Sequence, residues 1–252
     1  MLLPDPSTAQ VYLIEGSGNN MWSDHDDFYV VWKKLQGDFI VRARPGFMGE
    51  GAHPHRKMGW IARSNLEPGS AHASLAVHGD GLTALQFRRT AGAETEEVRS
   101  SVTVPDVIQL ARTGRAFTMS VARFGEAFTS DEVTELDLGS EVYVGLFVCS
   151  HDEKVSERAL FRNVRIVVPA PDDLVPYQDY LGSRLEILEV ENGHRQVVHT
   201  TADSLQAPNW TPDGKTLIYN RNGLLYEFDL NDKRAQVLDT GFATNNNNDH
   251  VL

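Results

Sequence analysis

Residues 207–219 read APNWTPDGKTLIY and place a tight turn between two strand-forming segments. Pro212 fixes φ near the value that a turn requires, Asp213 can bond its own backbone, and Gly214 can adopt a positive φ. We therefore expect the chain to reverse direction here, so that the segments on either side pair as antiparallel strands.

The segments after this turn continue the same pattern. Residues 224–230 alternate apolar and polar side chains, Asn231 and Asp232 favour a second turn, and residues 235–238 form another short apolar segment. This succession resembles the blade repeat of TolB-like β-propellers, a resemblance that implies a packing role for Trp210. A blade takes ~40 to 45 residues and a ring needs at least four blades. Residues 183–252 give room for about one blade.

An incomplete ring predicts apolar faces that neighbouring blades would otherwise cover. We expect a hairpin over residues 185–199 and the start of a second blade over residues 245–252. The apolar side chains of the single blade would pack on the sandwich, pair with a second copy, or remain loosely ordered. These side chains are Leu217, Tyr219, Leu225 and Phe228. Self-association through the incomplete propeller is therefore one expectation.

The first two thirds of the chain consist of short alternating segments separated by glycine and proline. The segments that read as strands are residues 28–32, 38–44, 57–63, 71–78, 83–89, 107–110, 116–124, 142–149 and 161–168. Strands at this spacing predict a β-sandwich. The motifs at residues 16–22 (GSGNNMW), 27–30, 35–39, 142–151 and 159–166 resemble concanavalin A-like jelly-roll domains. The fold class that we predict is all-β, a jelly-roll sandwich plus a partial propeller blade.

A proline-rich stretch separates the two parts. Residues 169–176 read PAPDDLVP, and three prolines with two acids discourage both helix and sheet. We therefore predict a sandwich over residues 1–168, a linker over residues 169–182 and the propeller segment over residues 183–252.

Composition narrows the classes of partner and compartment. The hydrophobic content of 41% and the charged content of 23% are ordinary for a globular protein. The formal net charge of -12 argues against a nucleic-acid partner. Cys149 lies in an apolar segment, which predicts a core residue.

The first residues resemble no signal peptide and no segment predicts a membrane span. We expect a periplasmic or extracellular location if the natural protein carries an export signal, and a cytoplasmic one otherwise.

Alternation along the strands predicts a polar, locally cationic sheet face. In residues 71–78, His72 and His78 fall on the face opposite Leu75 and Val77. Arginine donates paired hydrogen bonds to carboxylates, so the face suits sugar hydroxyls or a uronate. The alternative is an exposed face that needs only polar residues. The candidate ligand-binding residues are Arg42, His55, Arg56, Arg63, His72, His78, Gln86 and Arg88.

Two further clusters suggest a cation site. His53 and His55 share a loop, but no third ligand is adjacent and Arg56 and Lys57 would repel a cation. We predict no metal and no cofactor there, and place the loop at the rim of the binding face. The acids of residues 24–27 could hold calcium, but acids also favour turns, and turn formation is the preferred interpretation.

A third cluster carries the carboxylates that a glycosidase needs. Residues 135–138 (ELDL) resemble the catalytic strand of jelly-roll glucanases, which reads Glu-x-Asp-x-x-Glu. Glu135 and Asp137 match, but Ser140 occupies the acid/base position, and Glu141 falls on the opposite face. The sequence therefore favours a non-catalytic protein.

Three functions are compatible with these patterns. The preferred one is a carbohydrate-recognition module attached to a TolB-like propeller. The second is the substrate-binding part of a polysaccharide lyase or hydrolase whose active site lies in the rest of the propeller. The third is a protein-interaction scaffold, as the TolB resemblance implies.

Overall fold

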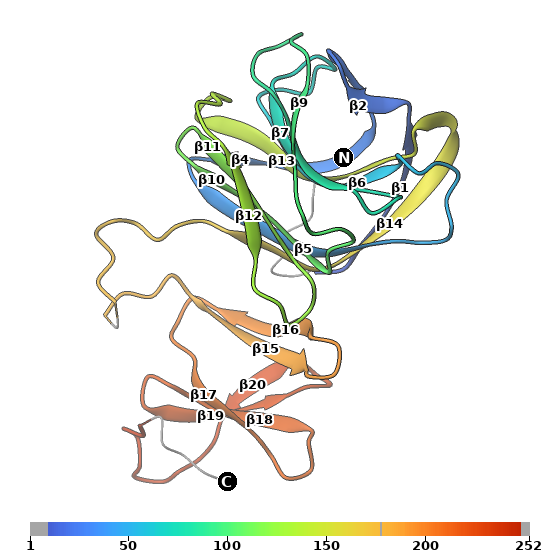
Figure 1. Cartoon of the computed structure of the whole chain (residues 1–252). Coiled ribbons are helices and arrows are strands. Elements are labelled where there is room, and N and C mark those ends of the chain that lie inside the picture. The colour runs from blue at the N-terminus through green and yellow to red at the C-terminus, as the bar shows by residue number, and fades with distance from the viewer. Residues whose placement is uncertain (1–9, 177, 248–252) are drawn as a thin grey trace. The chain divides into compact units, whose positions relative to one another are not determined.

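The computed structural model describes residues 10–176 and 178–247, and within these ranges it contains β-strands and no helix (Figure 1). The chain divides into two compact units, Met1–Pro169 and Ala170–Leu252. The prediction of an all-β fold is confirmed. A search of the described residues finds no helix that could cross a membrane.

The larger unit contains two six-stranded antiparallel sheets. The front sheet has the order β4 (Tyr29–Gln36), β13 (Glu141–Cys149), β6 (Lys57–Arg63), β7 (His72–His78), β8 (Thr83–Arg88) and β9 (Glu96–Arg99). The back sheet has the order β1 (Tyr12–Gly18), β14 (Asp152–Val167), β5 (Phe39–Phe47), β10 (Val107–Thr113), β11 (Ala116–Ala122) and β12 (Thr129–Val133). Many neighbours in a sheet are far apart in sequence, as a jelly roll requires.

The two sheets enclose one hydrophobic core. The inward side chains of the front sheet include Trp60, Leu75 and Leu85, and those of the back sheet include Val41 and Leu110. All five are fully buried, and each contributes on the order of 1.5–3 kcal/mol of transfer free energy. The predicted jelly-roll sandwich is therefore confirmed.

A small hairpin covers the outer face of the front sheet. It consists of β2 (Asn20–Trp22) and β3 (His25–Asp27). Met21 is fully buried in a second cluster with Ile61, Phe147 and Cys149. The core position predicted for Cys149 is confirmed, and burial raises the pKa of its thiol. The sequence predicts an open outer face, but this hairpin covers part of it.

The strand predictions are most accurate in the centre of the front sheet, and they miss β1, the first half of β14 and the polar edge strands. The predicted boundaries of β6 are those observed, and the predicted strand at residues 107–110 extends to Thr113 as β10. The sequence does not predict β9 (Glu96–Arg99) or β12 (Thr129–Val133), because these edge strands are polar and show no alternation.

The smaller unit is built from one hairpin and one meander. The hairpin pairs β15 (Ser183–Glu189) with β16 (His194–Thr201). The meander is a four-stranded sheet of β17 (Gln206–Trp210), β18 (Thr216–Arg221), β19 (Leu224–Asp229) and β20 (Arg234–Val237), in sequence order. A sheet of this order is what one propeller blade requires.

The turn between β17 and β18 has the chemistry predicted for it. Gly214 has φ 69°, and its amide donates to the carbonyl of Thr211 over 2.9 Å. A carboxylate oxygen of Asp213 accepts from the amide of Lys215 over 3.1 Å. The packing role predicted for Trp210 is wrong, because its side chain is 49% exposed and lines a shallow depression.

The apolar face of the meander is covered within its own unit. Leu217, Tyr219 and Phe228 are buried together with Leu185 of the hairpin. The three expected outcomes are packing on the sandwich, pairing with a second copy and loose order, and none of them includes this cover by β15 and β16. Of the residues predicted to start a second blade, 248–252 lie outside the described residues, as do residues 1–9.

Candidate functional site

The predicted binding residues do not share one open face. Arg63, His72 and Arg88 lie on the outer face of the front sheet, as the alternation predicts, but all three are buried. Arg42 lies on β5 in the back sheet, where it donates two hydrogen bonds to Gln109 Oε1 over 3.0 and 2.6 Å. The prediction fails for Arg42 because alternation tells which side of a strand a residue occupies but not which sheet the strand joins.

Asp26 of β3 binds the arginines at one end of this outer face. Its carboxylate accepts two parallel hydrogen bonds from Arg88, each 2.9 Å long, and a third of 3.1 Å from Arg63. The ring of His72 lies beside it, with Nδ1 3.7 Å from Oδ2. We call these four residues the Asp26 cluster. Its arginines hold the hairpin to the sheet, so they have no exposed charge to offer a sugar.

The Asp26 cluster also shows what the acidic residues of the segment 24–27 do. Asp26 is a buried ion-pair partner, and Asp27 Oδ2 accepts from the amide of Asn19 over 2.9 Å. Both carboxylates therefore stabilise the hairpin. This agrees with the preferred interpretation that these acids have a structural role. Sequence alone missed the role of Asp26, because its arginine partners lie 37 and 62 residues away.

Burial lowers the pKa values of two members of the Asp26 cluster, His72 and Arg63. The pKa of His72 is lowered to about 4, mainly by burial; Asp26 opposes this change, and the nearby Arg88 and Arg63 add to it. Burial also lowers the pKa of Arg63, again opposed by Asp26. His72 is therefore neutral near pH 7.

The other end of the outer face gathers a different set of polar groups. Lys57 Nζ donates to Asn20 Oδ1 over 2.7 Å, which holds this end of the hairpin. Gln86 Nε2 lies 3.4 Å from His78 Nε2 and donates to Glu97 over 2.8 Å. Burial, with a smaller effect of Lys57, lowers the pKa of His78 to about 4, so this imidazole is neutral.

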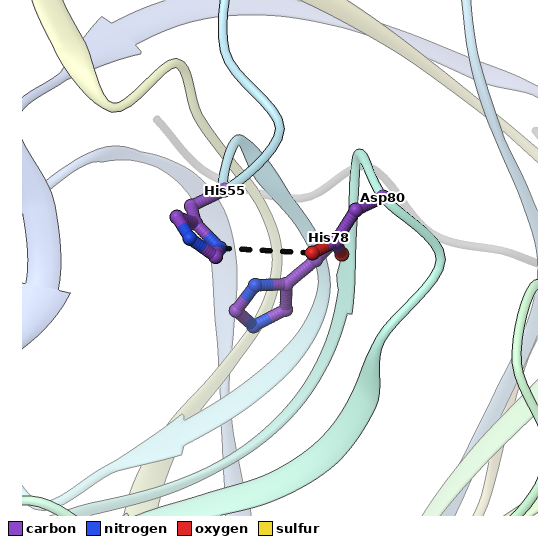
Figure 2. Close-up of side chains that lie close together, drawn as sticks. All are labelled: His55, His78 and Asp80. Carbon is purple, nitrogen blue, oxygen red and sulfur yellow. Dashed lines mark ion pairs between the residues drawn. The ribbon is translucent and has the colours of Figure 1, made fainter.

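Four histidines, His78 among them, and one aspartate meet at this end of the face. The ring centroids of His53 and His151 lie 4.2 Å apart, and that of His55 lies 6.0 Å from His78 and 5.9 Å from His151. His55 Nδ1 lies 3.9 Å from Asp80 Oδ2, and Figure 2 shows these two side chains and His78 converging. We call His53, His55, His78, Asp80 and His151 the histidine cluster.

Strand pairing explains why the sequence did not reveal the histidine cluster. Lys57 is the register partner of His78, so the loop before β6 meets the turn after β7. The premise that His53 and His55 have no third ligand within reach is therefore wrong. One nitrogen or oxygen from each of His55, His78 and Asp80 lies within 4.8 Å of the others.

A pocket of about 320 Å³ adjoins the histidine cluster. It lies between the end of β5, the loop after it and the turn that follows β7. Its lining includes Phe47, Arg56, Met58, Val77, His78 and Asp80. The Arg56 guanidinium lies 4.2 Å from the Phe47 ring centroid and donates to Glu157 over 2.7 Å. We call this cavity the Phe47 pocket.

The glucanase-like carboxylates lie on a loop. Leu136 and Leu138 are buried and the two acids exposed, as the alternation predicts, but residues 134–140 form no strand. Glu135 pairs with Arg115 over 3.1 Å, and Asp137 accepts from the amide of Gly139 over 2.9 Å. Neither residue lines the Phe47 pocket.

Comparison with known proteins gives one similar sequence and several similar folds. No family model matches the chain. A stretch of 71 residues is 46% identical to the uncharacterized protein Atu1656 of Agrobacterium fabrum, and covers 28% of this chain and 24% of that protein. The chain thus spans about a quarter of the length of this relative.

Solved structures resemble the sandwich in fold. A functionally unknown protein from Saccharomyces cerevisiae gives a TM-score of 0.50 at 10% identity, over 65% of this chain and 90% of its own. The GH43 protein BlXynB from Bacillus licheniformis gives a TM-score of 0.49 at 9% identity, over 63% of this chain and 33% of its own. The larger unit therefore has the fold of a two-sheet jelly-roll sandwich.

Proposed function

We propose that the larger unit is a non-catalytic carbohydrate-recognition module that binds a sugar in the Phe47 pocket. The observation that carries the proposal is a single cavity whose lining residues include the aromatic Phe47 together with the polar residues His78 and Asp80. A pyranose has an apolar C–H face and a rim of hydroxyls, and this lining offers a partner for each. Binding sites typically combine mostly apolar walls with a few placed polar groups.

The size of the pocket supports a small ligand. Binding cavities begin at roughly 300 Å³, so a volume of about 320 Å³ suits one sugar ring and leaves little room for a second. Ligand recognition on a jelly roll has to be argued from such a site, since the fold serves many functions. The proposal therefore rests on the lining of the pocket.

The charges of the pocket favour a neutral sugar over a uronate. Arg56 and Asp80 are the charged residues of its lining, and Arg56 is already paired with Glu157 over 2.7 Å. A uronate would meet the carboxylate of Asp80 without an uncommitted cation from the lining. Of the two ligands expected for the cationic sheet face, a sugar bound by its hydroxyls and a uronate, the lining of the pocket favours the first.

The test is calorimetry of the full chain with two panels of ligands. Neutral ligands are glucose, galactose, mannose, xylose and their disaccharides, and acidic ligands are the corresponding uronates. We expect binding of at least one neutral ligand, and about tenfold weaker binding for Phe47→Ala, which removes the ring. Phe124→Ala is the matched control, because Phe124 also contacts an arginine, Arg44, at 5.2 Å but lies outside the pocket.

Two outcomes oppose the proposal. Absence of heat with every neutral ligand at millimolar concentration contradicts sugar recognition. Unchanged affinity of Phe47→Ala, with its fold verified by circular dichroism, contradicts the Phe47 pocket as the site.

We also propose that residues 183–252 contain about one blade of a TolB-like propeller. The four-stranded meander in sequence order supports it. In a longer protein the sandwich would then present a sugar to the propeller, either for recognition alone or for a lyase or hydrolase reaction. In a protein that carries this sandwich with a complete propeller, an assay for new reducing ends or unsaturated sugars separates these two roles.

A further inference from the structure

We propose that His55, His78 and Asp80 form a binding site for a divalent transition metal ion of the zinc type. This inference goes beyond sugar recognition and does not depend on it. The ion would join the loop before β6 to the turn after β7, two segments that the register of β6 and β7 already brings together.

The spacing of the donor atoms suits a single small ion. Zinc binds nitrogen and oxygen at about 2.0–2.2 Å, so two ligands in a tetrahedron lie about 3.4 Å apart. His55 Nδ1 and Asp80 Oδ2 are 3.9 Å apart, and the donor atoms of all three residues lie within 4.8 Å of one another. A closer approach requires only small movements of His55 and Asp80, which are exposed side chains.

His78 provides an independent sign that a ligand belongs at this position. Its side chain is 5% exposed, and its Nδ1 has no hydrogen-bond partner among the residues that the structure describes. Buried polar atoms without a protein partner are uncommon in folded proteins, and a bound ion or water often satisfies them. Nδ1 of the neighbouring His151 is in the same situation.

The chemistry of the donors selects the class of ion. Two imidazoles with one carboxylate suit zinc and its neighbours, whereas calcium and magnesium prefer sites made of oxygen alone. Three protein ligands leave a fourth position for water or a bound molecule. The nearby charge of Arg56 would repel a cation, but Glu157 balances it at 2.7 Å.

The surrounding histidines restrain the loop that carries His55. His53 Nδ1 accepts a hydrogen bond from the amide of His55 over 3.0 Å, and the His53 ring lies against His151. The backbone of the loop is therefore held near the turn that carries Asp80. The amide of Asp80 itself donates to the carbonyl of Pro54 over 2.9 Å.

The test is zinc titration of the full chain, stripped of metal with a chelator, in the absence of sugar. We expect one zinc ion per chain in calorimetry. His55→Ala and Asp80→Asn should each weaken the affinity by at least about tenfold, the usual size of a lost ligand or its support. His25→Ala is the control, since His25 is an exposed histidine of the hairpin outside this cluster, and it should bind zinc like the unchanged protein.

Substitution of cobalt provides a second readout of the site. We expect the visible bands of tetrahedral cobalt in the unchanged protein and their loss in both ligand variants. Wild-type zinc affinity in His55→Ala and Asp80→Asn, or no binding at tens of micromolar zinc, overturns the proposal. Phe47→Ala should retain zinc, so loss of sugar binding and loss of metal binding are distinguishable.

Discussion

The two ends of one sheet face use similar residues for opposite purposes. At the end with the Asp26 cluster, two arginines and a histidine surround a carboxylate that satisfies their charge, and the hairpin closes over them. At the end with the histidine cluster, His78 and His151 retain buried nitrogens without partners in the described part of the chain. Arg63 Nε and His72 Nε2 also lack partners among the described residues, so unpartnered nitrogens alone do not separate the two ends. The ends differ because a buried carboxylate offsets the charges at the first, whereas His55, His78 and Asp80 bring donor atoms within 4.8 Å of one another at the second.

The largest effect is expected from Asp26→Asn. This change removes the charge that Arg63 and Arg88 share and leaves two buried cations uncompensated. Loss of one partner of a buried ion pair typically costs about 3–5 kcal/mol of unfolding free energy. Urea denaturation of the full chain measures it, with Asp24→Asn, an exposed neighbour on the same hairpin connection, as the control.

A loss below about 1 kcal/mol for Asp26→Asn would contradict the structural role of the cluster. It would mean that the arginines find other partners, such as the carbonyls of Ser23 and Ser70 that already accept from Arg88. The arginines of the outer face would then not depend on Asp26 for their hydrogen bonds.

His72 should make the free energy of unfolding fall as the pH is lowered. Its folded pKa of about 4 lies below the usual value of 6.5, so the unfolded chain binds a proton more readily. The stabilisation is complete above pH 6.5 and is lost as the pH falls toward 4. The charged groups that face the ring are Asp26 of β3, Arg63 of β6 and Arg88 of β8.

The measurement is urea denaturation at pH 7 and pH 5 for the unchanged protein and for His72→Gln. We expect the unchanged protein to lose about 2 kcal/mol more than the variant between these pH values, since one pKa unit corresponds to about 1.4 kcal/mol. Equal losses in the two proteins would show that His72 is not held neutral by its surroundings.

The contrast between the two ends also marks how far the sequence alone can predict this protein. Period-two alternation placed His72, Arg88 and Leu75 on the correct sides of their strands, because that information is local. The sheet membership of Arg42 is set by long-range pairing, which alternation does not contain.

Residues 20–27 show the same limit most clearly. Their short strands and acidic character favour an exposed turn, and only the folded chain reveals that Met21 and Asp26 are buried beneath it. The histidine cluster was hidden in the same way, because His55 and His78 approach each other through the pairing of β6 with β7.

The smallest stability effect is expected at the histidine end. His55 is exposed, and its ion-pair contact with Asp80 spans 3.9 Å, so little of its interaction energy is protected from water. In metal-free protein, His55→Ala should change the unfolding free energy by no more than about 0.5 kcal/mol. Thermal and urea denaturation of the chelator-treated chain measure this, and they use the same variant as the zinc titration. A large loss of stability without metal would show that His55 supports the fold, as Asp26 does, and the difference between the two ends would disappear.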